Sequence, residues 1–149
     1  MYLNKFKKII ITICLLTLFM QNSLKAKNDY YEDAKKFFLE KNYEKSKFLF
    51  QRNIVFNPKD YNSYLYLAKI FKNENNNIEF EINLNTTLLL NPENEEAMYM
   101  LIEQKIDQSN FLEVAELKEK FSKICKELCD KKKLIDQKLK NFDTNNEVE

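Results

Sequence analysis

The chain contains only two prolines, Pro58 and Pro92, and an asparagine precedes each of them. The two prolines lie 34 residues apart, and the same shift superimposes Tyr30 on Tyr64 and Met98. A period of this length is typical of repeat proteins, in which each repeat is one supersecondary unit that packs on its neighbours. The period predicts repeats at 27–60, 61–94 and 95–128.

Each repeat contains two segments whose apolar residues recur at helical spacing. In the first repeat these segments are "YYEDAKKFF" and "SKFLFQRNIVF", and in the second they are "YLYLAKIF" and "FEINLNTTLLL". Polar turns rich in Asn separate the two segments, and Asn suits positions that need a left-handed backbone or a side-chain partner. Proline cannot continue a helix, so each Asn-Pro ends a repeat, and Asp60 and Asn94 are the expected N-caps of the helices that follow. The pattern predicts an all-α chain.

The residues at fixed positions of these repeats resemble the tetratricopeptide repeat (TPR) family. The first two repeats supply the family's aromatic, small and proline positions with Tyr30, Ala34, Phe37, Tyr43, Ser46 and Pro58, and with Tyr64, Leu67, Ala68, Phe71 and Pro92. The third keeps Met98, Leu101, Phe111 and Val114, but has Lys105, Lys118 and Lys126 where two aromatics and a proline are usual. The resemblance implies a right-handed α-solenoid of about three TPR helix pairs.

The segment after the third repeat carries Leu134, Ile135 and Leu139 on one face among charged residues. An exposed terminal repeat needs its apolar face covered. We therefore interpret residues 129–142 as a C-terminal capping helix and residues 143–149 as a disordered tail.

The first 26 residues are typical of a secretory signal peptide. Three lysines precede Ile9–Met20, a run of twelve residues without a charge, and Ala26 offers a cleavage site. The alternative is a retained membrane anchor, although a spanning helix needs about 20 apolar residues. Cleavage after Ala26 predicts a periplasmic protein of a Gram-negative bacterial envelope, without stable membrane insertion.

Composition limits the chemistry that the chain can perform. Cleavage removes four lysines and no acidic residue, so the formal charge changes from +1 to −3, and nucleic-acid binding is disfavoured. The chain has no His and no Gly, which excludes a His-based catalytic centre and a Gly-rich phosphate loop. Ser and Thr occur singly, without a partner base. We therefore predict a non-enzyme with no catalytic residues, no metal and no cofactor.

Cys125 and Cys129 are the only cysteines left after cleavage. An even count in an oxidising compartment favours a disulfide, which would hold the turn at which the third proline is missing. Two alternatives remain open. The residues could be free thiols on one continuous helix, or a redox-active or metal-binding pair.

The TPR resemblance implies a concave groove lined by the first helix of each repeat. The positions that face this groove in the family correspond here to Tyr31, Lys35, Phe38, Asn62, Leu65, Lys69, Lys72, Tyr99, Glu103 and Ile106. Glu103 conflicts with the basic clamp that some family members use to hold a peptide's terminal carboxylate. The resemblance implies binding of a protein or peptide partner, and the alternative is a structural or self-associating accessory of envelope assembly.

Overall fold

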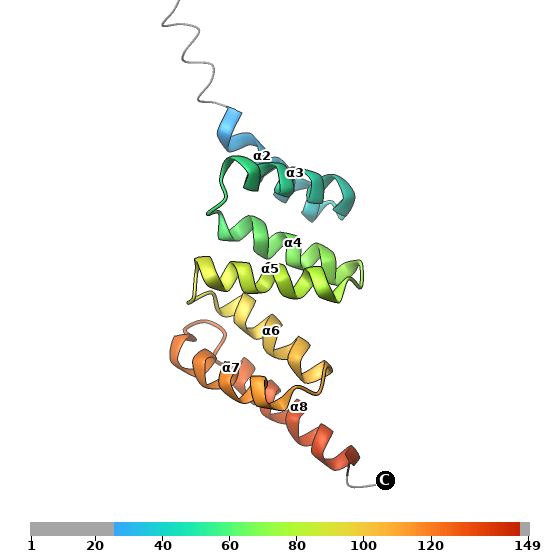
Figure 1. Cartoon of the computed structure of the whole chain (residues 1–149), viewed down its shortest axis with the longest axis vertical. Helices are drawn as coiled ribbons and strands as arrows, with labels where there is room; N and C mark the ends of the chain where they lie inside the picture. The colour runs from blue at the N-terminus through green and yellow to red at the C-terminus, as the bar shows by residue number, and fades with distance from the viewer. Residues whose placement is uncertain (1–25, 147–149) are drawn as a thin grey trace, which may run out of the picture. The chain divides into compact units, whose positions relative to one another are not determined.

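The computed structural model describes residues 26–146, which are helical and contain no strand (Figure 1). The predicted signal peptide lies outside the described residues, apart from Ala26. Contacts divide the chain into a first unit, Met1–Phe56, and a second unit, Asn57–Glu149. The first unit contains α2 (Ala26–Leu39) and α3 (Tyr43–Phe56). The second contains α4 (Tyr61–Asn73), α5 (Asn77–Leu90), α6 (Glu95–Asp107), α7 (Phe111–Ile124) and α8 (Lys131–Asn146).

In the first unit, α2 and α3 pack closely at the two small residues of the repeat. Ala34 and Ser46 are fully buried, and the Ser46 hydroxyl donates a hydrogen bond of 2.8 Å to the Ala34 carbonyl oxygen. Phe50 fills the space beside them, with the Tyr31 ring edge-on at 5.8 Å between centroids. Small residues are needed here because a larger side chain would separate the two helix backbones.

In the second unit, successive antiparallel helices share one core. Helix α5 packs between α4 and α6, while α7 and α8 both contact α6 (Figure 1). Ala68, Ile70, Leu84, Ile102 and Phe121 are fully buried where these helices meet. Burial of side chains of this size is the main term that stabilises stacked helices.

The turns inside the repeats share one backbone conformation. The residue before the asparagine has a positive φ in each turn, at Lys41 (59°), Asn75 (56°) and Ser109 (56°). The asparagine that follows caps the next helix, because its side-chain oxygen accepts the backbone N–H three residues later. These bonds measure 3.3, 3.2 and 3.4 Å for Asn42, Asn76 and Asn110. Asn thus serves mainly as the cap, and only Asn75 takes the left-handed position.

The helices that close each repeat end at Phe56, Leu90 and Ile124, again 34 residues apart. Asn94 then caps α6, with its side-chain oxygen 2.9 Å from the Ala97 backbone nitrogen. Asp60 occupies the N-cap position of α4, but its carboxylate accepts the Ser63 hydroxyl at 2.7 Å and no backbone N–H.

Helix α8 corrects the predicted end of the fold. It begins at Lys131 and continues to Asn146, so residues 143–146 are helical where the sequence favoured a disordered tail. Residues 147–149 lie outside the described part. Ile135 is fully buried, whereas Leu134 remains 39% exposed. Among the helices described between residues 26 and 146, none combines the length and apolar character needed to span a membrane.

Candidate functional site

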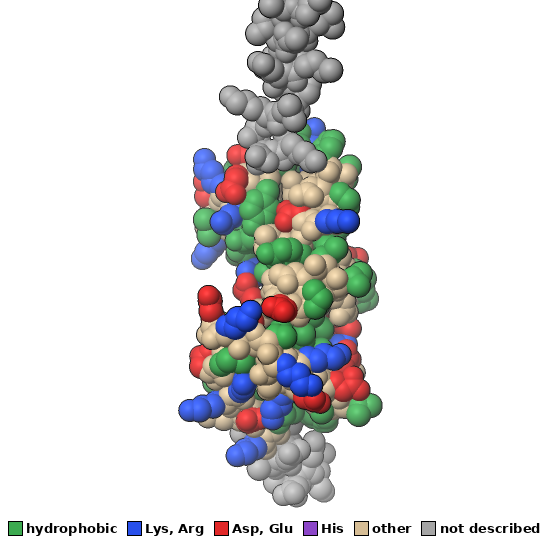
Figure 2. Space-filling model, turned by 90° about the vertical axis from the view of Figure 1, so that its left-hand side faces the viewer, with side chains coloured by type: hydrophobic (Ala, Val, Ile, Leu, Met, Phe, Trp, Pro, Cys, Tyr) green, Lys and Arg blue, Asp and Glu red, His purple; other side chains and the backbone are tan. Residues whose placement is uncertain are grey.

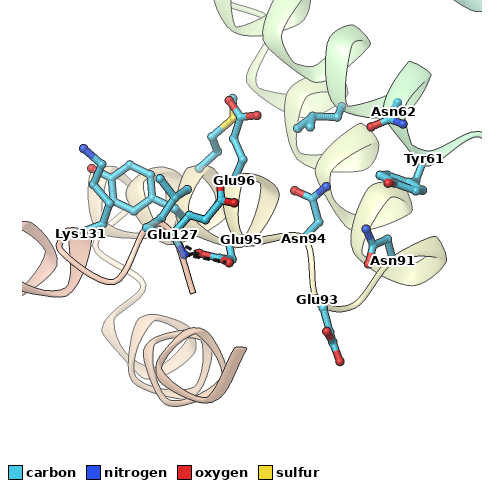
Figure 3. A pocket seen from close by; sticks show the side chains of 13 residues that line it. Tyr61, Asn62, Asn91, Glu93, Asn94, Glu95, Glu96, Glu127 and Lys131 are labelled. Carbon is cyan, nitrogen blue, oxygen red and sulfur yellow. Dashed lines mark hydrogen bonds between the residues drawn. The ribbon is translucent and has the colours of Figure 1, made fainter. Parts of the chain in front are cut away.

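A cavity of about 660 Å³ opens in the second unit, where the α5–α6 turn lies near the loop that joins α7 to α8 (Figure 3). We call it the edge pocket. Its lining comes from the start of α4, the first turns of α6, the two connections and the first residue of α8. Tyr61, Leu65, Tyr99, Met100 and Leu128 supply its apolar and aromatic surface.

The polar lining of the edge pocket is mainly acidic. Four glutamates line it, Glu93, Glu95, Glu96 and Glu127, against a single cation, Lys131. Figure 3 shows the Glu93 side chain directed away from the other labelled carboxylates. The wider face turned toward the left of Figure 1 carries acidic and basic side chains close together (Figure 2). The acidic character is therefore local to the pocket, where it favours a cationic ligand group.

Glu95 holds the cysteine-containing loop in place. Its carboxylate accepts the backbone N–H groups of Glu127 at 3.1 Å and of Leu128 at 2.8 Å (Figure 3). The bond from Leu128 is the main reason that the pKa of Glu95 lies below its usual value. Since these amides belong to the pocket wall, Glu95 shapes the pocket more than it offers a charge to a ligand.

Cys125 and Cys129 bracket this loop. Their sulfur atoms lie at bonding distance, and their α-carbons are 5.2 Å apart. Helix α7 ends at Ile124, and Cys125 has an extended backbone (φ −62°, ψ 135°). The two cysteines therefore do not lie on one continuous helix, which was one of the alternatives that the sequence left open.

A second polar network crosses the helices beside the edge pocket. Glu103 of α6 accepts the Tyr99 hydroxyl at 2.8 Å and the Lys138 ammonium of α8 at 2.6 Å. Lys72 of α4 lies 3.8 Å from the same carboxylate. Burial acts to raise the pKa of Glu103, but the bonds from Lys138 and Tyr99 outweigh it and hold this pKa below its usual value.

Tyr99 faces the edge pocket and also contacts this network. Burial, together with its hydrogen bond to Glu103, raises the pKa of Tyr99 to about 12. The phenol therefore stays protonated near neutral pH and donates to the Glu103 carboxylate. Its ring lies 6.3 Å from the Phe121 ring between centroids, so the core holds its position.

Lys105, which stands where the TPR pattern expects an aromatic, is almost completely buried. Its ammonium bonds Glu81 of α5 at 2.5 Å and Glu113 of α7 at 3.1 Å. Burial acts to lower the pKa of Lys105, but these two bonds outweigh it and raise this pKa. The hydrogen bond from Lys105 likewise lowers the pKa of Glu81. Ion pairs here take the place of the aromatic contact.

The predicted groove residues fall into several environments. Asn62, Leu65 and Tyr99 line the edge pocket. Two predicted lysines form ion pairs between α4 and α6, since Lys69 lies 2.8 Å from Glu96, and Lys72 pairs with Glu103.

The remaining predicted groove residues do not line the edge pocket. Tyr31, Lys35 and Phe38 are half-buried on α2 of the first unit. Ile106 is fully buried. It therefore belongs to the core and offers no surface to a ligand, which corrects its prediction as a groove residue.

The pocket residues that the groove prediction missed lie in the connections between helices. Asn91, Glu93, Glu95, Glu127 and Lys131 all come from these connections or from the helix turns beside them. The 34-residue period contained a signal for them, because counting on from Pro92 reaches Lys126 in the cysteine loop. Turns at equivalent repeat positions lie at the same edge of a stack.

No group of three His, Cys, Asp or Glu side chains between residues 26 and 146 is arranged to hold a metal ion. No protein-family model and no curated protein matches the sequence.

Several solved structures resemble the chain in fold. The Yersinia enterocolitica type III secretion translocator chaperone SycD has a TM-score of 0.72 at 14% identity, over 89% of this chain and 94% of SycD. SycD in complex with a peptide of the translocator YopD has a TM-score of 0.66 at 12% identity, over 84% and 95%. The CopN–Scc3 complex has a TM-score of 0.63 at 16% identity, over 78% and 68%. Together with the repeated helix pairs, these likenesses show that this chain has an all-helical, TPR-like fold.

Proposed function

We propose that this chain is a non-catalytic TPR-like module that binds a segment of another protein in the edge pocket. The observation that carries the proposal is the pocket itself, about 660 Å³ in volume and lined from two repeats and the α8 region. A peptide can lay apolar side chains against Tyr61, Leu65 and Met100 while a basic side chain meets Glu96 or Glu127.

The comparisons support a protein ligand because one of the matching SycD structures holds a peptide of the translocator YopD. The composition supports a non-catalytic role, since the chain has no His and the cavity is lined by carboxylates, amides and tyrosines without a nucleophile and base pair.

We further propose that the protein acts in the bacterial envelope after export, with Cys125 and Cys129 joined as a disulfide. The support is the signal-like segment 1–26 and the even number of cysteines that cleavage leaves. Mass spectrometry of the protein recovered from the periplasmic fraction tests both points. We expect a chain that begins at Lys27 and has a mass two protons below that of the reduced form. An intact first residue and two free thiols would contradict this location.

Selection of random peptides on the full-length chain tests the binding function. We expect enrichment of peptides that combine basic and aromatic or aliphatic residues, with affinities measured by calorimetry. Asn62→Arg places a bulky cation in the pocket and should weaken the selected peptides at least about tenfold. Gln137→Arg, on the exposed side of α8, is the matched control and should leave the affinity unchanged. Equal affinities of the two variants would refute the edge pocket as the binding site.

A further inference from the structure

Helix α5 carries apolar residues around its whole circumference. Phe80 and Leu84 are buried against the neighbouring helices, yet Ile78, Ile82 and Leu89 are 74%, 51% and 81% exposed. A helix that is apolar all round is normally covered on every side. At 100° per residue the three exposed residues fall on one stripe, so α5 presents a continuous apolar face to solvent.

This stripe borders a groove of about 630 Å³ between α5 and α7, which we call the outer groove. Leu89 forms one wall, and Met98, Leu101 and Leu117 supply buried apolar surface at its base. Since Tyr99 and Met100 of α6 line the edge pocket, the two cavities use different sides of the same helix.

The α7 side of the outer groove has opposite charges at its two ends. Lys120 and Lys123 line the groove in the C-terminal half of the helix. Glu116 is exposed in the N-terminal half and lies one helical turn before Lys120, on the same side. Reversing the direction of this helix would therefore place acidic groups where the basic groups now stand.

We propose that the outer groove and the α5 stripe bind a second copy of this chain, with the two α7 helices antiparallel about a twofold axis. A twofold axis brings the same patch of both copies together, so Glu116 of each copy faces Lys120 of the other. The apolar stripes of the two α5 helices are removed from water in the same step, and apolar burial drives the association. A parallel arrangement would oppose like charges and is disfavoured.

Sedimentation velocity of the full-length chain, over a range of concentrations, tests the dimer. We expect a concentration-dependent dimer that Leu89→Lys weakens at least about tenfold, because a charge replaces an apolar anchor at the interface. Leu134→Lys, at another partly exposed leucine in the second unit, is the control and should leave the dimer intact. Far-UV circular dichroism verifies that both variants are folded. A monomer at every concentration, or equal weakening by both variants, would overturn the proposal.

A charge exchange tests the antiparallel geometry. Lys120→Glu opposes acidic residues across the twofold axis, and Glu116→Lys opposes basic residues, so each variant alone should be mostly monomeric. An equimolar mixture of the two variants restores both pairs and should form a heterodimer. A mixture as monomeric as its components would refute the antiparallel arrangement. Because Asn62→Arg lies in the edge pocket, its effect on peptide binding separates a failure of the proposed function from a failure of this dimer.

Discussion

Glu103 connects three helices of the second unit, and its removal should reveal how much this connection contributes. The substitution Glu103→Gln keeps an oxygen that can accept the Tyr99 hydroxyl but abolishes the charge that faces Lys72 and Lys138. The Glu103 side chain is only 19% exposed, while the two lysine side chains are 52% and 43% exposed. The pairs are therefore screened by solvent on the lysine side.

The magnitude follows from the two lysine pairs and the tyrosine bond. Partly exposed ion pairs contribute about 0.2–1 kcal/mol each, so Glu103→Gln should lower the free energy of unfolding by about 1 kcal/mol at pH 7. Glu103→Ala also removes the charged acceptor of the Tyr99 hydroxyl, and should cost about 2–3 kcal/mol in total.

The pH dependence provides a sharper test of the same prediction. The pKa of Glu103 is lower in the folded chain than its usual value, so the folded state favours the charged carboxylate. Its contribution to stability is complete above the unfolded pKa and is lost as the pH falls through the folded pKa. The difference between the wild type and Glu103→Gln should therefore be largest near pH 7 and should vanish as Glu103 becomes protonated at acid pH.

Urea unfolding followed by circular dichroism at neutral and acid pH measures these differences. Glu119→Gln is the matched control, because Glu119 pairs with Lys123 on a fully exposed surface and should cause no measurable change. A Glu103→Gln variant as stable as Glu119→Gln at pH 7, or equally destabilised at both pH values, would refute the reasoning.

Three further predictions concern the turns around the edge pocket. Asn94→Ala removes the N-cap of α6 and should lower the free energy of unfolding by about 1 kcal/mol; an unchanged urea midpoint would contradict the capping role. Cys125 and Cys129 should resist alkylation until the protein is reduced, and Cys129→Ser should cost about 2 kcal/mol or less because the loop is short; rapid labelling without reductant would show free thiols. Glu95→Gln should speed hydrogen exchange at the Leu128 amide, measured by NMR, since a neutral acceptor binds this amide less strongly. Unaltered exchange would show that Glu95 does not hold the loop.

The repeat architecture could be predicted from sequence because several local signals agreed. The 34-residue period, the apolar spacing and the turn residues all predicted helix pairs, and the all-helical, TPR-like fold confirms that prediction. Asn94 shows the agreement at one residue, since its type predicted a cap and the structure contains the bond to Ala97.

The edge pocket was harder to predict because it depends on contacts between distant turns. Glu95 and Leu128 are far apart in the sequence, and neither belongs to the groove positions of the TPR pattern. Lys105 illustrates a related difficulty, since an aromatic-to-lysine change suggested a weakened repeat, whereas Glu81 and Glu113 from neighbouring helices accommodate the charge. Ile106 was misplaced because a small rotation of a helix decides whether a residue faces the groove or the core.

The left-handed turn residues have a consequence for engineering this chain. A left-handed conformation costs a residue with a β-carbon about 1 kcal/mol, and glycine adopts it without that cost. Asn tolerates the conformation, but Lys41 and Ser109 gain nothing comparable from their side chains. The helix pairs impose the turn on whatever residue lies there. These two positions are therefore unused reserves of thermal stability, and glycine at either one would raise the melting temperature while leaving both proposed binding surfaces untouched.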